Sequence, residues 1–294
     1  MATDMTSTDQ FEAHRSLLTG VAYRMLGRIA DAEDVVQDAW LRWTAEERPE
    51  VREPRAYLVR ITTRLAIDRL RQAHVRKEAY VGPWLPEPVA TDLRSAVPDS
   101  AERAMLAESV SFAVLVVLES LSPLERAVFV LREAFGFPYA EIATVLDRGE
   151  AAVRQLGARA RRHVDERRPR YDVDETERRA LTEQFLAAAG GGDLEALLRL
   201  LAPDVRLIGD SGGKAKAPLR IMEGADKVGR FLSAVSGDAG LYEFSVMEIN
   251  GAPALLARTG GKLDLVLQLE VADGAIACVY IVRNPDKLSG VIKE

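Results

Sequence analysis

The chain has 294 residues, enough for two or three domains, and its 48% hydrophobic content is sufficient for packed cores. The formal net charge of -6 argues against a protein that coats nucleic acid with its whole surface. The single cysteine, Cys278, excludes a disulfide within the chain, and the three histidines are too scattered for a metal site, so no metal or cofactor is expected. No apolar run approaches the roughly 18 residues of a membrane span and no secretory signal is evident, so a cytoplasmic location is expected.

Residues 11–27 predict a first helix, and residues 31–43 predict a second helix with two contrasting faces. Asp31 is expected to cap the N-terminus of the second helix. An apolar face is predicted from three residues at helical spacing: Val36, Trp40 and Trp43. The acids at positions 31, 34 and 38 fall on another face, which predicts a surface for a basic protein partner.

The next helix is expected over residues 54–72, and basic residues dominate the segment 55–77 to which it belongs. Its buried stripe is predicted at Leu58, Ile61 and Leu65. A neighbouring stripe carries an aromatic residue and three arginines: Tyr57, Arg60, Arg64 and Arg71. Seven basic residues against one acid, Asp68, favour a nucleic-acid contact. The alternative is an ordinary solvated face, in which Arg64 pairs with Asp68 four residues later.

Residues 78–100 predict an extended, semi-rigid linker, because prolines recur at positions 83, 86, 88 and 98. Trp84 and Leu85 are unusually apolar for such a segment. We therefore expect them to lie against another part of the protein, since exposed apolar surface is unfavourable in water.

A second helix-rich segment follows this linker. An apolar helix is expected over residues 101–121. Ser122, Pro123 and Glu125 form a capping-box pattern, which predicts the start of another helix that runs to about Phe135.

The stretch 139–163 has the pattern of a helix-turn-helix. Helices at 139–146 and from 150 to about 168 flank the turn 147–149, where Asp147 tolerates a left-handed conformation. A small residue and two apolar contacts stand where the motif needs them: Ala143, Val153 and Leu156. Arginines at 154, 159, 161 and 162 favour DNA binding over the alternative, an ordinary helical hairpin in a bundle.

The pattern changes after Pro169, where helices give way to strands. Helices are expected at 174–189, 194–201 and 225–235, and strands at 205–209, 219–222, 242–249, 252–257, 263–271 and 275–282. Mostly antiparallel, meandering strands after helices predict a separate α+β domain. The glycine-rich stretch at 209–214 is no phosphate loop, because Ile208 replaces its first glycine and Ala215 its Ser/Thr, so a tight turn is expected. Cys278 is expected to be a small buried hydrophobic residue on a strand.

These segments together resemble the extracytoplasmic-function sigma factors. Residues 11–77, with DAEDVVQDAW and PRAYLVRITTRLAIDRLR, resemble sigma region 2. Residues 104–167, with SPLERAVFVLREAFGFPYAEIATVLDRGEAAVRQLGARAR, resemble region 4. Three more motifs resemble signatures of the subgroup with a C-terminal SnoaL-like domain: WLPEP at 84–88, DSGGK at 210–214 and NPDKL at 284–288.

The resemblance implies a multidomain chain in which two all-α sigma domains precede an α+β SnoaL-like, cone-shaped domain. The first sigma domain is a region 2 helical bundle and the second a region 4 helix-turn-helix. The boundaries that we expect are 9–77 for region 2, 78–103 for the linker, 104–168 for region 4, 174–283 for the SnoaL-like domain and 284–294 for a C-terminal tail.

The resemblance also implies functional sites. Binding of the polymerase core is expected at Asp31, Asp34, Gln37 and Asp38. Contacts to the −10 promoter element are expected at Arg55, Tyr57, Arg60, Arg64 and Arg71. Contacts to the −35 element are expected at Arg154 and Gln155, for base edges, and at Arg159 and Arg162, for phosphates.

A regulatory contact between domains is expected from the three subgroup signatures. Its residues are Trp84, Leu85, Pro86, Glu87, Pro88, Asp210, Gly212, Gly213, Lys214, Asn284, Pro285, Asp286, Lys287 and Leu288. Three positions depart from the family's pattern: Tyr57 where many members have Trp, Arg64 where several have Asn, and Ser211 where Gly is usual. The first two leave the base preference open.

We therefore predict an RNA polymerase sigma factor whose partners are the core enzyme and promoter DNA and whose activity is modulated by its own C-terminal domain. No catalytic residue is predicted, because Asp210, Asp264 and Glu270 are isolated in the sequence from any orienting group. The alternatives are a moonlighting enzyme with a polyketide-cyclase-like domain and a conventional repressor or activator with an enzyme-like sensor. The last alternative does not explain the acidic helix at 31–38. Whether the C-terminal domain binds a small ligand stays open.

Overall fold

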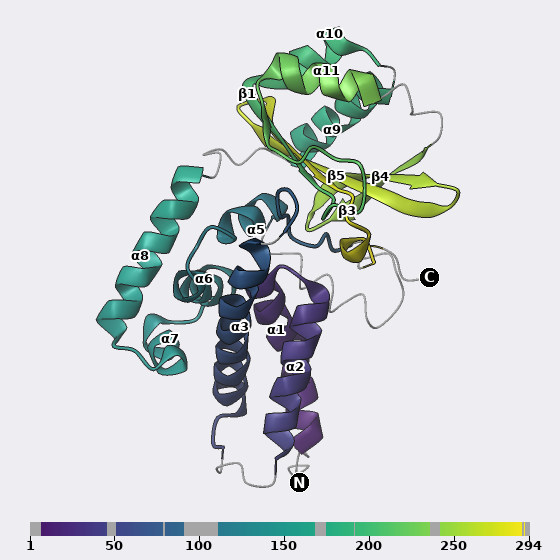
Figure 1. The fold of residues 1–294 in the computed structure, drawn as a ribbon. Helices are drawn as coiled ribbons and strands as arrows, with labels where there is room; N and C mark the ends of the chain where they lie inside the picture. The colour runs from purple at the N-terminus through teal and green to yellow at the C-terminus, as the bar shows by residue number, and fades with distance from the viewer. Residues whose placement is uncertain are drawn as a thin grey trace. The chain divides into compact units, whose positions relative to one another are not determined.

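A computed structural model of the chain describes residues 7–45, 51–78, 80–90, 111–167, 175–190, 192–235, 242–289 and 291. These residues form two compact units (Figure 1). The first unit holds the described residues of Met1–Glu78 and Val114–Arg168, and the second holds those of Ala79–Ala96, Ser111–Ala113 and Pro169–Glu294. The described part of the linker, residues 80–90, therefore belongs to the second unit. Among the described helices, none combines the length and the apolar character that a membrane span requires.

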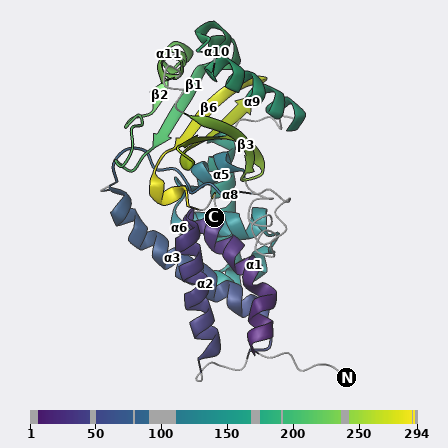
Figure 2. The same cartoon turned by 90° about the vertical axis from the view of Figure 1, so that its right-hand side faces the viewer.

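Three long helices build one half of the first unit: α1 (Ser7–Leu26), α2 (Ile29–Thr44) and α3 (Pro54–Glu78). They pack on one another (Figure 2). Side chains such as Phe11, Trp43 and Leu58 are fully buried. The predicted cap of α2 is wrong. The helix begins at Ile29, so the N-cap is Arg28, and Asp31 lies within the first turn, where its charge complements the helix dipole.

The other half of the first unit consists of short helices and one long helix. They are α5 (Phe112–Leu118), which belongs to this unit from Val114 on, α6 (Pro123–Phe129), the π-helical turn η1 (Val130–Ala134), α7 (Tyr139–Leu146) and α8 (Glu150–Arg167). The predicted capping box is confirmed, because the Glu125 N–H donates to Ser122 Oγ (3.4 Å) and the Ser122 N–H donates to Glu125 Oε2 (3.3 Å). Residues 101–110 of the helix predicted at 101–121 lie outside the described residues. The helix predicted from Ser122 to about Phe135 changes to π geometry at Val130.

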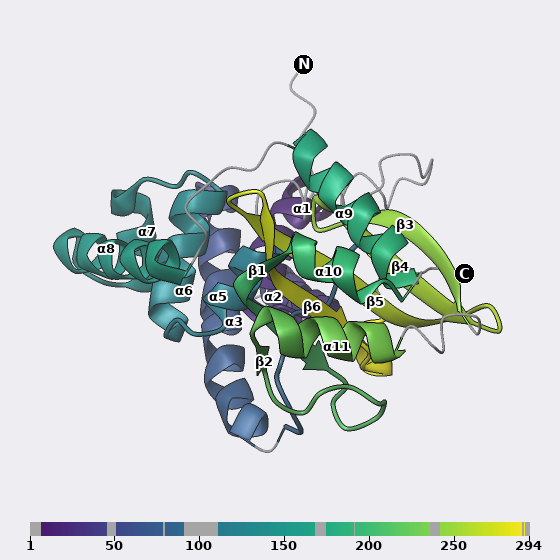
Figure 3. The ribbon, with the colours of Figure 1, turned by 90° about the horizontal axis from the view of Figure 1, so that it is seen from above.

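The second unit is a six-stranded sheet with helices over one face (Figures 1 and 3). Its strands are β1 (Leu201–Asp210), β2 (Met222–Glu223), β3 (Glu243–Ile249), β4 (Ala252–Thr259), β5 (Lys262–Ala272) and β6 (Ala275–Val282), in the order β2-β1-β6-β5-β4-β3. The run β3 to β6 is the antiparallel meander that the pattern predicts. Strand β1, however, pairs in parallel with β6, so the sheet is mixed.

Three helices cover the core face of this sheet: α9 (Glu175–Gly190), α10 (Leu194–Leu200) and α11 (Ala225–Val235). Phe185, Leu197 and Val228 from these helices are fully buried against Leu207 and Val279 of the sheet. The predicted strand at 219–222 is wrong in its bounds, because β2 spans only Met222–Glu223, the two residues that pair with β1. A short 3-10 turn, η3 (Pro285–Lys287), follows β6.

Candidate functional sites: two helix faces, a helix-turn-helix and a linker clasp

The acidic face predicted on α2 is present and is partly compensated by a neighbouring helix. Asp31 is half-buried and lies 3.8 Å from an Arg28 nitrogen and 3.9 Å from an Arg69 nitrogen of α3. Asp34 is exposed and forms an ion pair with the same Arg69. Gln37 and Asp38 are exposed on the following turns. The part of the predicted site that is exposed and not paired with Arg69 is therefore its C-terminal end, at Gln37 and Asp38.

The basic stripe of α3 divides into exposed and engaged arginines. Arg60 and Arg71 are exposed, and Arg71 Nη1 lies 3.1 Å from Asp68 Oδ1. Arg64 is half-buried, and its Nε donates to the carbonyl oxygen of Val145 in α7 (3.2 Å). The local pairing of Arg64 with Asp68 is therefore not what the structure shows.

At the start of α3, too, residues predicted to contact DNA have partners within the protein. Tyr57 is half-buried, and its ring centroid lies 6.0 Å from that of Trp43. The Arg55 guanidinium lies 4.5 Å from the centroid of Phe137, just before α7. Such a cation–ring contact is worth about 0.5–1 kcal/mol at an exposed site. Two of the five residues predicted for the −10 element, Arg55 and Arg64, thus contact the helix-turn-helix half of the unit.

The helix-turn-helix prediction matches the geometry of α7 and α8. Asp147 adopts the left-handed conformation expected at the turn (φ 54°). Ala143 and Val153 are buried between the helices, and Leu156 is half-buried. A Cβ on Gly157 would meet the Tyr139 hydroxyl at 2.9 Å, so the absence of a side chain there permits the close approach of α8 to α7.

The candidate −35 residues lie on the outer side of α8. Arg154, Gln155, Arg159 and Arg162 are all exposed. Arg154 Nε donates to Glu150 (3.0 Å), and Arg159 Nε donates to Glu125 (3.0 Å). The hydrogen bond from Ser122, together with that from Arg159, lowers the pKa of Glu125. These partners are exposed or partly exposed, so breaking either ion pair should cost little.

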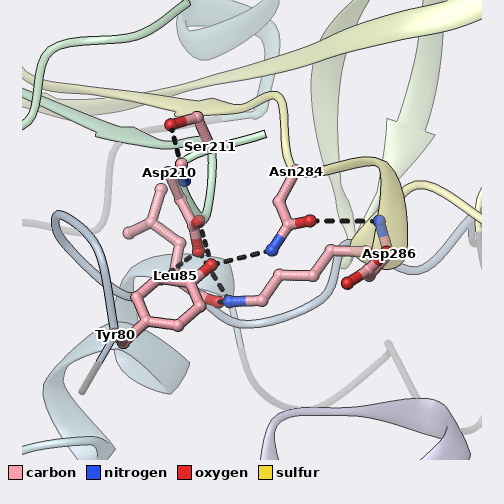
Figure 4. A network of polar contacts seen from close by, with 8 residues as sticks. Tyr80, Leu85, Asp210, Ser211, Asn284 and Asp286 are labelled. Carbon is pink, nitrogen blue, oxygen red and sulfur yellow. Dashed lines mark hydrogen bonds and ion pairs between the residues drawn. The ribbon is translucent and has the colours of Figure 1, made fainter. Parts of the chain in front are cut away.

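Three short segments meet within the second unit: the linker motif, the 210–214 turn and the 284–288 segment (Figure 4). We call this arrangement the linker clasp: residues 80–90 held by residues 210–214 and 284–288. Asp210 lies at its centre and is fully buried. Its carboxylate accepts hydrogen bonds from the Tyr80 hydroxyl, from the Leu85 N–H (2.8 Å) and from Lys287 Nζ (2.6 Å).

Lys287 connects the chain's last segment to the linker. This residue is 1% exposed, and its Nζ donates to the Leu85 carbonyl (2.6 Å) as well as to Asp210. The same ammonium lies 3.2 Å from the centroid of the Trp84 ring. The expectation that the apolar Trp84 and Leu85 lie against another part of the protein therefore holds, and Leu85 is fully buried.

The rest of the linker motif continues this docking. Pro86, Glu87 and Pro88 are buried, and the Val89 N–H donates to Asn250 Oδ1 (3.0 Å). The Asn250 N–H in turn donates to the Val89 carbonyl (2.9 Å), so this stretch pairs with the β3–β4 turn like a short strand. Tyr80 and Asn250 were not predicted. Tyr80 stands four residues before the motif, and nothing local to Asn250 indicates a partner some 160 residues away.

The outer part of the clasp is polar and exposed. Lys214 forms an ion pair with Asp286, and both side chains are 52% exposed. Gly212 has a φ of 55°, and a Cβ there would meet Asn284 Nδ2 at 2.6 Å, so a glycine is required. Asn284 caps the 3-10 turn that begins at Pro285, and Leu288 is buried. Residues 290 and 292–294 of the predicted tail lie outside the described residues.

Comparison with known proteins identifies the family. The sigma-70 region 2 model matches residues 10–76, and the sigma-70 region 4 model matches residues 111–164. The ECF RNA polymerase sigma factor SigJ of Mycobacterium tuberculosis is 39% identical over 96% of this chain and 93% of its own length. The chain belongs to the extracytoplasmic-function sigma factors. Its function is promoter-specific initiation of transcription.

A second relative and a crystal structure match this sigma factor over almost its full length. The probable ECF sigma factor SigI of Mycobacterium tuberculosis is 34% identical over 97% of this chain and 95% of its own length. The crystal structure of SigJ from that organism matches 98% of this chain and 100% of its own with a TM-score of 0.78 and 37% identity. The predicted fold class is thereby confirmed, with helical regions 2 and 4 followed by a mixed-sheet SnoaL-like domain.

Two buried arginines that the sequence analysis missed join region 2 to region 4 of the sigma factor. Arg126 of α6 is 2% exposed, and its Nη1 donates to the Met25 carbonyl at the end of α1 (2.6 Å) and to Glu119 (3.0 Å). Arg24 of α1 lies with its guanidinium 4.8 Å from the Phe135 centroid. Burial lowers the pKa of Arg24 to about 10. Their sequence neighbourhoods carry no sign of these distant partners.

Proposed function

We propose that this sigma factor binds the polymerase core through the acidic face of α2 and promoter DNA through α3 and α8. The observation that carries these roles is the match of both sigma regions to helices whose predicted contact residues are largely exposed. Aromatic and cationic side chains on α3 suit the unpaired −10 strand, and exposed arginines on α8 suit the duplex −35 element. Because the core polymerase and promoters are in the cytoplasm, this proposal places the protein's action there too.

The proposed role of the second unit is regulatory, and no chemistry is assigned to it. Each acid that sequence reasoning considered as a base is occupied. Asp210 accepts three hydrogen bonds in the clasp, Asp264 forms an ion pair with Arg283, and Glu270 accepts from the Tyr280 hydroxyl. Burial raises the pKa of Tyr280 well above its ordinary value, so this phenol is a poor acid. We propose instead that the clasp limits the length of linker available between regions 2 and 4.

Reversing the charge of the acidic face is expected to weaken core binding. Asp34→Lys combined with Asp38→Lys should reduce retention of the protein by immobilised core polymerase and lower transcription from its promoter. Both side chains are exposed, so the fold should lose only about 0–1 kcal/mol for each pair that is broken. Glu195→Lys is the matched control, because Glu195 is an exposed helical acid of the second unit, paired with Arg199. Equal retention of the double variant and the control would contradict the proposal that α2 binds the core polymerase.

Arg154→Ala and Arg159→Ala are expected to differ in their effect on promoter choice. If Arg154 contacts a base edge, its loss should cost roughly 1–3 kcal/mol on the matched −35 element and much less on a mismatched one. Loss of a phosphate contact at Arg159 should weaken binding evenly and reduce its salt dependence. Binding of full-length protein to −35 duplexes at several salt concentrations measures both.

The control for this pair is Arg230→Ala in α11, since Arg230 also pairs with an acid four residues away but lies in the second unit. It should leave the affinity for both duplexes unchanged. Parallel losses on matched and mismatched duplexes for both α8 variants would contradict the division between base and phosphate contacts.

A further inference from the structure

A cavity of about 920 Å³ lies inside the second unit, between the concave face of the sheet and helices α9 and α11. Its walls are largely apolar and include Phe185, Phe231, Leu255, Leu267 and Ile281. Pockets of this size and character commonly enclose small organic ligands. The cavity belongs to neither the DNA-binding surfaces nor the clasp, and the role of a sigma factor does not require it.

Three of the polar lining residues lie close to one another at one end of the cavity: Lys216, Tyr242 and Arg283. Among the described lining residues, the charged ones are Lys216 and Arg283, and both are cationic. Arg283 Nη1 donates to the Lys216 carbonyl (2.9 Å), and Nη2 contacts the Tyr242 hydroxyl (3.4 Å) and the carboxylate of Asp264. This end of the cavity therefore offers hydrogen-bond donors and a surplus of positive charge.

Asp264 neutralises part of the charge of Arg283, and Lys216, which is exposed, supplies a second cation at the same end. An apolar interior beside such a cationic end is complementary to a molecule with one anionic head and a hydrocarbon body. A neutral hydrocarbon would leave the surplus positive charge without a counter-ion, and a polar molecule such as a sugar would leave the apolar walls unmatched.

We propose that the second unit is a binding site for a small amphipathic carboxylate, whose head lies at Arg283 and Lys216 and whose apolar body fills the cavity. This inference goes beyond the proposed roles of α2, α3 and α8, and its test does not depend on them. An acyl chain and a fused-ring acid share this chemistry, so the experiment includes one of each.

The proposed head-group site is directly connected to the clasp through the backbone. The Arg283 N–H donates to the Asp210 carbonyl (2.7 Å), and the adjoining Asn284 N–H donates to the same oxygen (3.0 Å). Asp210 is the residue whose carboxylate holds the linker. A ligand bound at Arg283 should therefore restrict the motion of the neighbouring end of β6 and of Asp210. Ligand binding should also stabilise the second unit.

The test uses the full-length protein and four probes. Dodecanoate and 1-pyrenebutyrate are the two carboxylates, and dodecanol and 1-pyrenebutanol are their uncharged counterparts. Calorimetry or pyrene fluorescence should show one-to-one binding of at least one carboxylate, with its alcohol weaker by roughly tenfold or more, as expected for the loss of a charge-assisted hydrogen bond. Preference for dodecanoate indicates an acyl ligand, and preference for 1-pyrenebutyrate indicates a fused-ring ligand.

Three variants locate the bound probe. Lys216→Met should weaken the carboxylate by roughly tenfold and leave the alcohol unchanged. Ala189→Trp places an indole into the cavity from α9 and should abolish binding of both. Lys262→Met is the matched control, an exposed lysine at the start of β5 that does not line the cavity, and should bind like the unaltered protein. Thermal unfolding checks that each variant is folded.

The proposal is overturned if neither carboxylate binds the unaltered protein. It is also overturned if acid and alcohol bind equally and Lys216→Met has no effect, or if a folded Ala189→Trp variant binds with full affinity. None of these outcomes depends on whether the protein binds polymerase or DNA.

Discussion

Replacing Lys287 by methionine is expected to lower the free energy of unfolding of the second unit by about 3–5 kcal/mol, the usual result of removing one partner from a buried ion pair. The lysine and Asp210 are 1% and 0% exposed, and their nitrogen and oxygen atoms are 2.6 Å apart. Methionine has a similar length, but it leaves the carboxylate buried without its cation. The Leu85 carbonyl loses a donor in the same substitution.

Lys214→Met is a closely matched control for this variant. Lys214 and Asp286 also pair a lysine and an aspartate between the 210–214 turn and the 284–288 segment, but both side chains are 52% exposed. The control should cost about 0–1 kcal/mol. Hydrogen exchange of the β1 and β6 amides reports the second unit separately from the first. Equal protection of those amides in the two variants would show that the buried pair does not hold the clasp.

The same two variants test the proposed regulation. The clasp withholds Tyr80–Ala90, a stretch that could otherwise add up to about 36 Å to the reach of the connection between regions 2 and 4. Lys287→Met should therefore raise transcription by core polymerase from the cognate promoter, and Lys214→Met should leave it unchanged. Reduced or unchanged transcription with a folded Lys287→Met protein would contradict a clasp that limits the linker.

Arg126→Met is expected to destabilise the first unit by about 3 kcal/mol, since it removes a buried guanidinium that bonds both an acid and a helix end. The Met25 carbonyl belongs to the last turn of α1, where carbonyl oxygens lack partners within the helix and benefit from a nearby positive charge. Glu119, whose side chain is 13% exposed, loses its arginine at the same time. Faster hydrogen exchange at the C-terminal end of α1 and in α6 would measure the loss.

Arg161→Met is the control for this second prediction. Arg161 also pairs with an acid, Glu133, but the two side chains are 51% and 37% exposed. The substitution should change the stability of the first unit by about 0–1 kcal/mol. If Arg126→Met were equally mild, the contact between α6 and the end of α1 would be incidental to the packing of the unit.

Local sequence patterns were sufficient to predict most elements of the fold. Ser122, Pro123 and Glu125 predicted a capping box because all of its atoms lie within four residues. The strands β3 to β6 were predicted because each turn joins neighbours in the sequence. Strand β1 pairs in parallel with β6, some 70 residues later, and periodicity carries no information about such a partner. The π turn after Phe129 and the start of α2 at Ile29 were also missed.

The candidate sites show the same limit. The apolar character of Trp84 and Leu85 indicated that the linker lies against something, but hydrophobicity is non-directional and did not indicate Lys287 or Asp210 as the partners. Arg64 was predicted as a DNA contact from the charge of its helix face. Its hydrogen bond to the Val145 carbonyl depends on where α7 lies, and this follows from the tertiary fold alone.

We also expect the contact of α3 with α7 to affect the affinity for a complete promoter. Elements centred at −10 and −35 are about 25 base pairs apart, or about 85 Å along the duplex. With Arg64 Nε 3.2 Å from Val145 and Arg126 Nη1 2.6 Å from Met25, the helices proposed to contact these elements lie within one compact unit, so this form cannot bridge both. The apparent dissociation constant for a complete promoter then equals the intrinsic constant divided by the fraction of molecules in which regions 2 and 4 have separated. A duplex carrying a single −35 element requires no separation. The ratio of the two affinities, compared between the unaltered protein and Arg126→Met, therefore measures how much the substitution changes that fraction.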